Sequence, residues 1–241
     1  MINNYKNKRI AIVTGASTGI GREVAVSLSE QGYIVMILAR REDKLLETKN
    51  LIEAKGGEAI VYKIDLSDIS QVKKFINYVK TITNKVELIV NTAGVWHNET
   101  NVFANTNFGD FNENVVVQTL NVGVTAPTLI IHGLINLMPQ NSNIVNISGT
   151  FENGAKGWLP YYLSKKAIED LTIGLSEELK DKQIYVNCIS PSDTATEEYK
   201  KFFPQYIAES ASVEEVGKEI IKFCINKKKT TGEIKIVKKV S

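Results

Sequence analysis

The sequence predicts an α/β fold, a Rossmann-type doubly wound parallel sheet of about seven strands with helices on both faces. Short apolar runs bounded by turn residues recur along the chain, and amphipathic helical stretches separate them. The runs are almost continuous in apolar residues, which is typical of parallel strands buried on both faces. The chain has 241 residues, of which 43% are hydrophobic, enough for one large core. We therefore expect residues 1–241 to form a single domain.

The predicted strands and helices alternate from the first residues to the last. Strands are expected at residues 9–14, 34–39, 59–64, 88–91, 143–147, 185–189 and 233–237. Helices are expected at residues 21–31, 41–55, 70–83, 112–138, 161–182 and 213–226. In the last helix Val216, Ile220 and Phe223 fall on one side, which indicates a face packed on the core.

Composition argues against several classes of function. The net charge is only +2 and the lysine runs at 227–229 and 238–239 are short, so no nucleic-acid partner is expected. Cys188 and Cys224 lie in apolar stretches without metal-ligand spacing, which predicts buried thiols in a reducing compartment and no metal site. The first residues are polar, and we expect no apolar run to approach the roughly 18 residues of a membrane helix. We expect a cytoplasmic protein with no membrane partner.

The first predicted strand leads directly into a glycine-rich segment, TGASTGIG at residues 14–21, and then into a helix. Gly15 permits a tight turn, Gly19 lets the backbone approach a pyrophosphate, and Gly21 lets the helix pack closely on the strand. Free N–H groups at the start of that helix would face the anion. The predicted dinucleotide contacts here are Gly15, Ser17, Thr18, Gly19, Ile20 and Gly21.

The end of the second predicted strand indicates which dinucleotide binds. A site for NAD usually offers a carboxylate to the ribose 2′-hydroxyl, but here Arg40 and Arg41 follow Ala39. Two guanidinium groups without an acid favour a 2′-phosphate, which arginine can bind with two hydrogen bonds. The pattern therefore favours NADP over NAD. The alternative is that both arginines are only the solvated start of a helix.

A tyrosine and a lysine four residues apart occur twice in one predicted helix, as Tyr161 with Lys165 and as Tyr162 with Lys166. Residues at this spacing share a helix face, so either pair could place a phenol beside an ammonium group. The cation would lower the phenol pKa toward a range useful for proton transfer. The spacing alone does not distinguish the two pairs.

With the segment 14–21, the turn NTAG at 91–94 and the Tyr–Lys spacing, the chain resembles the short-chain dehydrogenase/reductase family over residues 8–237. The resemblance implies further cofactor contacts. Asp65 and Leu66 would contact the adenine, and Asn91, Ala93 and Gly94 would contact the cofactor from the turn. Tyr161 and Lys165 would contact it from their helix. Pro191, Thr194 and Thr196 would lie near the nicotinamide. It also implies that Asn121 anchors a water that relays protons. Two positions depart from the family pattern, Thr92 for the second Asn and Ser192 for a Gly.

The resemblance distinguishes the two Tyr–Lys pairs. Family helices carry Ser just before the catalytic Lys, then Leu-Thr six and seven residues after it and Glu-Leu thirteen and fourteen after it. Counting from Lys165 finds Ser164, Leu171-Thr172 and Glu178-Leu179, whereas counting from Lys166 finds none of them. Tyr161 and Lys165 are therefore the predicted catalytic pair.

The catalytic serine is harder to place. The family strand ends in Asn-Ile-Ser-Ser, and the second Ser, thirteen residues before the Tyr, is catalytic. Here the strand ends in Asn146-Ile147-Ser148-Gly149, so the strand motif points to Gly149, but the spacing to Tyr161 points to Ser148. We expect Ser148 to be the catalytic serine if the strand ends early and the following loop turns its side chain toward the site. Thr150, or no hydroxyl at all, are the alternatives.

The resemblance implies hydride transfer between NADP(H) and a small-molecule carbonyl or secondary alcohol, as in carbonyl and 3-oxoacyl reductases. Tyr161 would then exchange a proton with the substrate oxygen beside Lys165 and Ser148. A segment at residues 197–210 is expected to form a flexible cover over the substrate. The resemblance also implies a homodimer or homotetramer. The alternative function is a catalytically weak NADP-binding sensor or scaffold protein.

Overall fold

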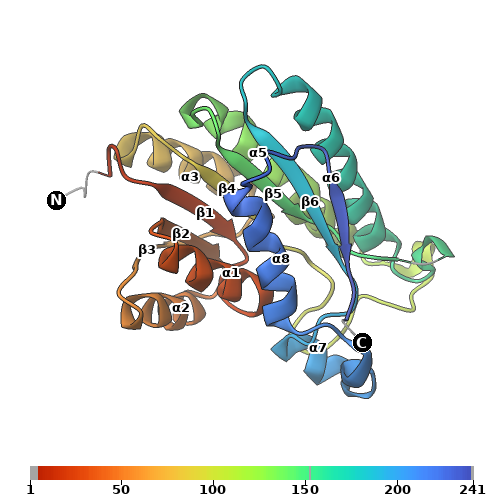
Figure 1. Cartoon of the computed structure of the whole chain (residues 1–241). Helices are drawn as coiled ribbons and strands as arrows, with labels where there is room; N and C mark the ends of the chain where they lie inside the picture. Colours follow the sequence, from red (N-terminus) through yellow and green to blue (C-terminus); the bar gives the residue numbers. More distant parts are fainter. Residues whose placement is uncertain (1–4, 152, 240–241) are drawn as a thin grey trace.

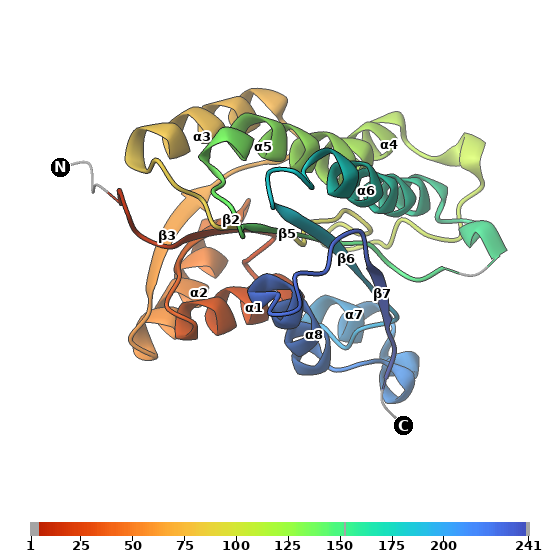
Figure 2. The same cartoon turned by 45° about the horizontal axis from the view of Figure 1, so that its top comes forward.

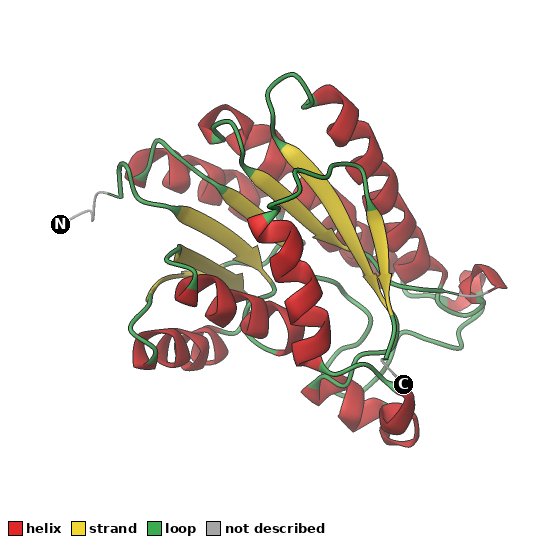
Figure 3. Ribbon diagram, in the orientation of Figure 1, coloured by secondary structure: helices red, strands yellow, loops and turns green. Residues whose placement is uncertain are grey.

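The computed structural model describes residues 5–151 and 153–239. Seven strands form one parallel sheet in the order β3-β2-β1-β4-β5-β6-β7, with helices on both faces (Figures 1 and 3). The order reverses between β1 and β4, because the chain returns to the middle of the sheet after β3 and then builds outward in the other direction. The doubly wound α/β fold expected from the sequence is confirmed.

The elements follow the predicted alternation within one or two residues at most ends. The strands are β1 Ile10–Thr14, β2 Ile34–Ala39, β3 Glu58–Lys63, β4 Leu88–Asn91, β5 Asn143–Ile147, β6 Tyr185–Pro191 and β7 Ile234–Val237. The helices are α1 Gly19–Glu30, α2 Glu42–Ala54, α3 Ile69–Ile82, α4 Glu113–Leu120, α5 Ala126–Leu134, α6 Leu159–Glu178, α7 Glu197–Phe202 and α8 Val213–Ile225.

Each face of the sheet carries its own hydrophobic core, because successive strand residues point to opposite sides. In β1, Ile10 and Ile12 pack with helices α3 and α5, whereas Ala11 and Val13 pack with α1 and α8. Figure 2 shows the two layers, with α3, α4, α5 and α6 on one side and α1, α2 and α8 on the other. Burial on both sides explains why the strands lack polar alternation.

The predicted single helix at 112–138 is interrupted. Helix α4 passes into a π-helical turn, Asn121–Thr125, before α5 begins, and a short 3₁₀ turn, Ile135–Leu137, ends the run. Pro127 lies in the first turn of α5, where its missing N–H removes one ordinary helical hydrogen bond. The prediction of a regular helix was wrong at this point. Such π-helical insertions often mark functional positions.

The helical run Glu113–Leu137 is long and apolar enough, by length and composition, to cross a membrane. This corrects the expectation that no such run exists in the chain. In the structure, however, Ala126, Ile130, Ile131 and Leu134 are buried against the sheet in the same core as α3. The run is a core helix of the folded domain.

The predicted covering segment at 197–210 is helical. It follows β6 and consists of α7 and a 3₁₀-helix, Pro204–Glu209. Thr196 caps α7, because its hydroxyl oxygen accepts a hydrogen bond of 3.1 Å from the N–H of Tyr199. The loops that follow β1, β2, β4, β5 and β6 meet this segment at the carboxyl edge of the sheet, where ligands bind in such folds.

Candidate active site

One cavity of about 1480 Å³ opens at the carboxyl edge of the sheet. It gathers most of the site residues expected from the sequence. They are Gly15, Ser17, Thr18, Gly19, Ile20, Gly21, Arg40, Arg41, Asp65, Leu66, Ala93, Gly94, Ser148, Tyr161, Lys165, Pro191, Thr194 and Thr196. Asn91 and Asn121 are not among the lining residues. The geometry thus brings the predicted dinucleotide residues and the Tyr–Lys pair into one space.

The glycines between β1 and α1 are required by the shape of the turn. Gly15 and Gly19 have φ angles of 68° and 54°, in the left-handed region that favours glycine. A Cβ on Gly21 would lie 2.3 Å from the carbonyl oxygen of Gly15, so no larger residue fits there. Thr18 precedes α1 and makes no side-chain cap, which leaves the first N–H groups of the helix to face the cavity. This cradle fits a pyrophosphate.

The second turn of the site, residues 91–94, is tied to the first. The hydroxyl of Thr92 donates a hydrogen bond to the carbonyl oxygen of Thr14, and the N–H of Thr92 donates to the Thr14 hydroxyl at 3.2 Å. A Cβ on Gly94 would lie 3.4 Å from both Lys165 Nζ and Tyr161 Cε2. Thr92 therefore holds the glycine turn in place, in contact with the Tyr–Lys pair.

Asn91 supports this turn from beneath the cavity. Its side-chain amide donates to Asn146 Oδ1 at 2.9 Å, and Asn146 donates in turn to the Thr172 hydroxyl at 2.9 Å. The chain of amides links β4, β5 and α6 inside the core. Asn91 Oδ1 is buried and has no hydrogen-bond partner among the described residues. The expected cofactor contact of Asn91 stays a prediction, since its side chain lies below the cavity.

Of the two Tyr–Lys pairs, only Tyr161 and Lys165 line the cavity. Lys165 Nζ lies 5.2 Å from the centroid of the Tyr161 ring and donates a hydrogen bond of 2.9 Å to the carbonyl oxygen of Ile147. The neighbouring Lys166 is exposed and pairs with Glu169 at 2.7 Å. The register that the family helix indicated is the one that faces the site.

Burial controls the ionisation of both groups. It lowers the pKa of Lys165, which is 3% exposed, to about 8. It also raises the pKa of Tyr161 above its ordinary value of about 10. The expected lowering of the Tyr161 pKa by Lys165 is absent from this structure, because the ammonium group donates to Ile147 and not to the phenol oxygen. The phenol therefore stays protonated at neutral pH.

The three candidate positions for a catalytic hydroxyl differ in orientation. Ser148 is 3% exposed, and its Oγ lies 3.5 Å from the carbonyl oxygen of Ile189 in the next strand. Thr150 Oγ1 donates to the carbonyl oxygen of Ser190 at 3.1 Å. A Cβ on Gly149, in contrast, would lie 3.8 Å from Lys165 Cγ and 3.3 Å from the Phe151 ring. The position whose Cβ would lie beside Phe151 and the Lys165 side chain thus carries no side chain.

Asn121 lies one helix behind the cavity, in the π-helical turn. Its side-chain amide donates to the carbonyl oxygen of Ser67 at 3.1 Å, which joins this turn to the loop after β3. The turn packs closely on α6, because a Cβ on Gly123 would lie 2.8 Å from Ser164 Cβ. Asn121 is therefore held beside the helix that carries Lys165, without lining the cavity itself.

Aromatic rings from separate loops form a wall around Tyr161. Phe203 packs against Trp96 at 6.3 Å and against Trp158 at 6.2 Å, and Trp158 lies 6.3 Å from Tyr161. Phe151 approaches Tyr161 edge-on at 5.7 Å. These rings come from segments far apart in the sequence, so sequence spacing does not group them. Their mutual contacts depend on the path of α7.

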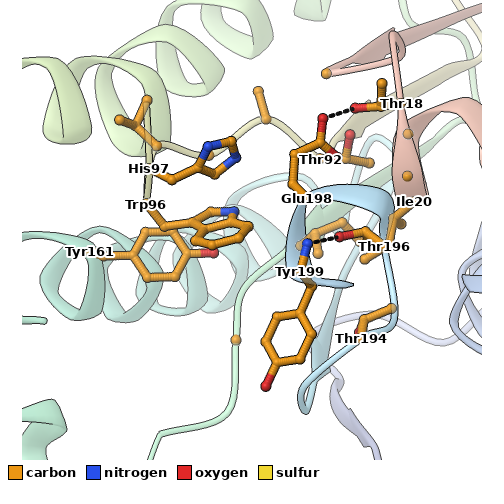
Figure 4. A pocket seen from close by; sticks show the side chains of 18 of the residues that line it. Thr18, Ile20, Thr92, Trp96, His97, Tyr161, Thr194, Thr196, Glu198 and Tyr199 are labelled. Carbon is orange, nitrogen blue, oxygen red and sulfur yellow. Dashed lines mark hydrogen bonds between the residues drawn. The ribbon is translucent and has the colours of Figure 1, made fainter. Parts of the chain in front are cut away.

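One site residue was missed entirely. Glu198 on α7 accepts a hydrogen bond of 3.1 Å from Arg41. It accepts another of 3.4 Å from the Thr18 hydroxyl, which Figure 4 marks. It lies more than 150 residues along the chain from Arg41, in the segment expected to form a flexible cover. Only the acidic character of the segment, Glu197-Glu198, could have indicated a partner for the arginines.

Comparison with known proteins agrees with this geometry. A family model described as short chain dehydrogenase matches residues 9–206. The uncharacterized oxidoreductase YgfF of Escherichia coli strain K12 is 32% identical over 196 residues, which cover 78% of this chain and 77% of that protein. The chloroplastic NADPH-dependent aldehyde reductase-like protein of Arabidopsis thaliana is 31% identical, covering 78% and 73%.

Among solved structures, the angucycline C-6 ketoreductase LanV with bound NADP is similar with a TM-score of 0.84. That similarity covers 97% of this chain and 96% of LanV at 22% identity, so it supports the fold. The family model spans well over half of the sequence and includes the glycine turn and the Tyr–Lys helix. The chain belongs to the short-chain dehydrogenase family of oxidoreductases.

Proposed function

We propose that the chain is an NADP-dependent reductase that transfers a hydride between NADP(H) and a carbonyl or secondary-alcohol substrate. The observation that carries this proposal is the phenol–ammonium pair of Tyr161 and Lys165 in the same cavity as the glycine turn. A dinucleotide bound along the turn would reach the phenol with its nicotinamide end. The NADP bound to LanV and the NADPH dependence in the name of the Arabidopsis relative support this choice of cofactor.

Different lining residues would contact different parts of the cofactor. The helix start at Thr18 and Gly19 would hold the pyrophosphate, and Arg40 with Arg41 would bind the 2′-phosphate. Asp65 is fixed by its own turn, since its Oδ1 accepts hydrogen bonds from the N–H and the hydroxyl of Ser67. The proposed adenine contacts are Asp65 and Leu66, and the proposed nicotinamide contacts are Pro191, Thr194 and Thr196.

The bound cofactor supplies or accepts the hydride at C4 of its nicotinamide. In the reducing direction Tyr161 donates its phenolic proton to the substrate oxygen as negative charge develops there. The ammonium group of Lys165 stabilises the phenolate that is left, because the buried site screens their attraction poorly. We assign to Asn121 the positioning of a water behind Lys165, through which the proton is replaced from solvent.

We assign no catalytic hydroxyl to Ser148. Its Oγ lies against the strand carbonyl of Ile189, and Thr150 is engaged with Ser190. The substrate oxygen then receives its hydrogen bond from Tyr161 alone. The end of β5 therefore supplies no catalytic hydroxyl.

The aromatic wall favours a carbonyl compound with an apolar or ring-bearing body. Trp96, Trp158 and Phe203 present half-buried rings to the cavity. Aldehydes, ketones and 3-oxoacyl thioesters all meet this description. The second candidate function is a catalytically weak NADP-binding sensor or scaffold, which Gly149 favours because it leaves the site one hydrogen-bond donor short.

We also propose a homo-oligomer formed through α4 and α6. Val117 on α4 and Leu163 and Ile173 on α6 are large apolar residues exposed by about half. Figure 2 shows these two helices side by side in the same layer. For the compartment we propose the cytoplasm, which suits two buried, free cysteines.

The direct test is oxidation of NADPH, followed by absorbance, against a panel of ketones, aldehydes and 3-oxoacyl thioesters. We expect turnover on carbonyls with an apolar body, with NADPH preferred to NADH. Tight binding of NADPH without turnover on any member of the panel would favour the sensor or scaffold function.

A further inference from the structure

Helix α7 lies against the cofactor side of the cavity (Figure 4). Its cap residue rests on the glycine turn, because a Cβ on Gly19 would lie only 3.0 Å from Thr196 Cγ2. Glu198, in the first turn of the helix, is directed at the same turn, and its Oε1 accepts the hydrogen bond from Thr18 that Figure 4 marks. The start of α7 and the phosphate cradle are thus in contact.

The carboxylate of Glu198 uses groups that a phosphate would need. Its Oε1 accepts hydrogen bonds from Arg41 at 3.1 Å and from Thr18 at 3.4 Å. The Glu198 side chain is 19% exposed, whereas that of Arg41 is 52% exposed, so the carboxylate is the more enclosed partner. Arg41 and Thr18 are the groups proposed above for the cofactor phosphates. An anion of the protein therefore stands where an anion of the cofactor is expected.

The other end of α7 reaches the substrate side of the cavity. Lys201 donates a hydrogen bond to the carbonyl oxygen of Glu99, in the loop after β4. The ring of Phe202 packs against His97 at 5.2 Å and Trp96 at 6.0 Å. Glu198 and Phe202 thus lie on one six-residue helix.

We propose that Glu198 is a specificity-determining carboxylate, which the 2′-phosphate of NADP(H) displaces from Arg41. The exchange frees the start of α7, the helix that also carries Phe202 beside the substrate-side rings. NADH carries no 2′-phosphate and gains nothing by freeing Arg41. Glu198 thus weakens NADPH binding more than NADH binding. The inference rests on the proposed placement of the 2′-phosphate at Arg41.

The test is Glu198→Gln, which removes the charge and keeps the shape of the side chain. We expect the Kd of NADPH, measured by quenching of tryptophan fluorescence, to fall by roughly 3- to 10-fold, the scale of one partly exposed charge pair. The Kd of NADH changes by less than about 2-fold on the same argument. Glu209→Gln is the matched control, since Glu209 is exposed in the same segment, does not line the cavity and should leave both Kd values unchanged. An unchanged or raised Kd of NADPH in Glu198→Gln overturns the inference.

Arg41→Ala separates this inference from the proposed function. If Arg41→Ala weakens NADPH and NADH equally, the placement of the 2′-phosphate is wrong. If it weakens NADPH selectively while Glu198→Gln brings no gain, only the role of Glu198 fails. In the Arg41→Ala background the gain from Glu198→Gln should vanish, because the two side chains act through one contact. Circular dichroism of each variant checks that the fold is retained.

Discussion

At the scale of single residues, position 149 is where the proposed mechanism lacks a second hydrogen-bond donor to the substrate oxygen. Gly149 points at Phe151 and Lys165, and a Cβ there would need the Phe151 ring to move by only a few tenths of an ångström. We expect Gly149→Ser to raise kcat on simple ketones by roughly 10-fold or more, since one well-placed donor is worth on the order of 10²-fold. The measurement is steady-state NADPH oxidation.

The paired variant is Ser148→Ala, for which we expect little change in kcat. Ser148 lines the cavity, but its hydroxyl lies 3.5 Å from the carbonyl oxygen of Ile189 in the next strand. A loss on the order of 10²-fold in Ser148→Ala, with no gain in Gly149→Ser, would instead make Ser148 the catalytic hydroxyl.

The ionisation of Lys165 predicts a pH dependence. Burial lowers its pKa to about 8, so the ammonium form is present below that pH and is lost as the pH rises through it. Tyr161 does not titrate in this window, because burial raises its pKa. We therefore expect kcat/KM for NADPH, which reports the free enzyme, to fall above about pH 8. A Lys165→Arg variant, whose charge persists, should retain a lower but flat profile, and a flat profile in the unaltered enzyme would contradict this assignment.

At the scale of elements, the exposed faces of α4 and α6 carry the proposed subunit contact. Leu163 is 51% exposed on α6, and we expect Leu163→Glu to shift the protein toward the monomer in analytical ultracentrifugation, because a carboxylate cannot be buried unpaired. Leu46→Glu is the matched control, as Leu46 is similarly exposed on α2, on the other side of the sheet. Equal sedimentation of Leu163→Glu and the unaltered chain would rule out this interface.

At the scale of the whole molecule, the fold could be predicted because strands buried on both faces of the sheet produce runs of apolar residues in the sequence. Strands such as β2, with five of its six residues buried, must be apolar throughout, and the glycines at 15 and 21 are required by backbone sterics. These constraints are local, so they can be read in the sequence.

The rest of the site depends on contacts between distant segments. The orientation of Ser148 follows from where β5 ends, and the break before α5 follows from Pro127 and the close packing of Gly123 on α6. The contact between Glu198 and Arg41 forms only once α7 is placed over the glycine turn. No pattern of spacing or hydrophobicity encodes these three features.

The central claim is that Tyr161, and not its neighbour, transfers the proton beside Lys165. The most direct measurement compares NADPH oxidation by Tyr161→Phe and Tyr162→Phe on one ketone substrate. Only the first of these rings lines the cavity with Lys165. We predict that Tyr161→Phe lowers kcat by roughly 10²- to 10⁴-fold, the usual contribution of a general acid, while NADPH still binds. Tyr162→Phe should keep most of the activity, and the reverse order of losses would contradict the account.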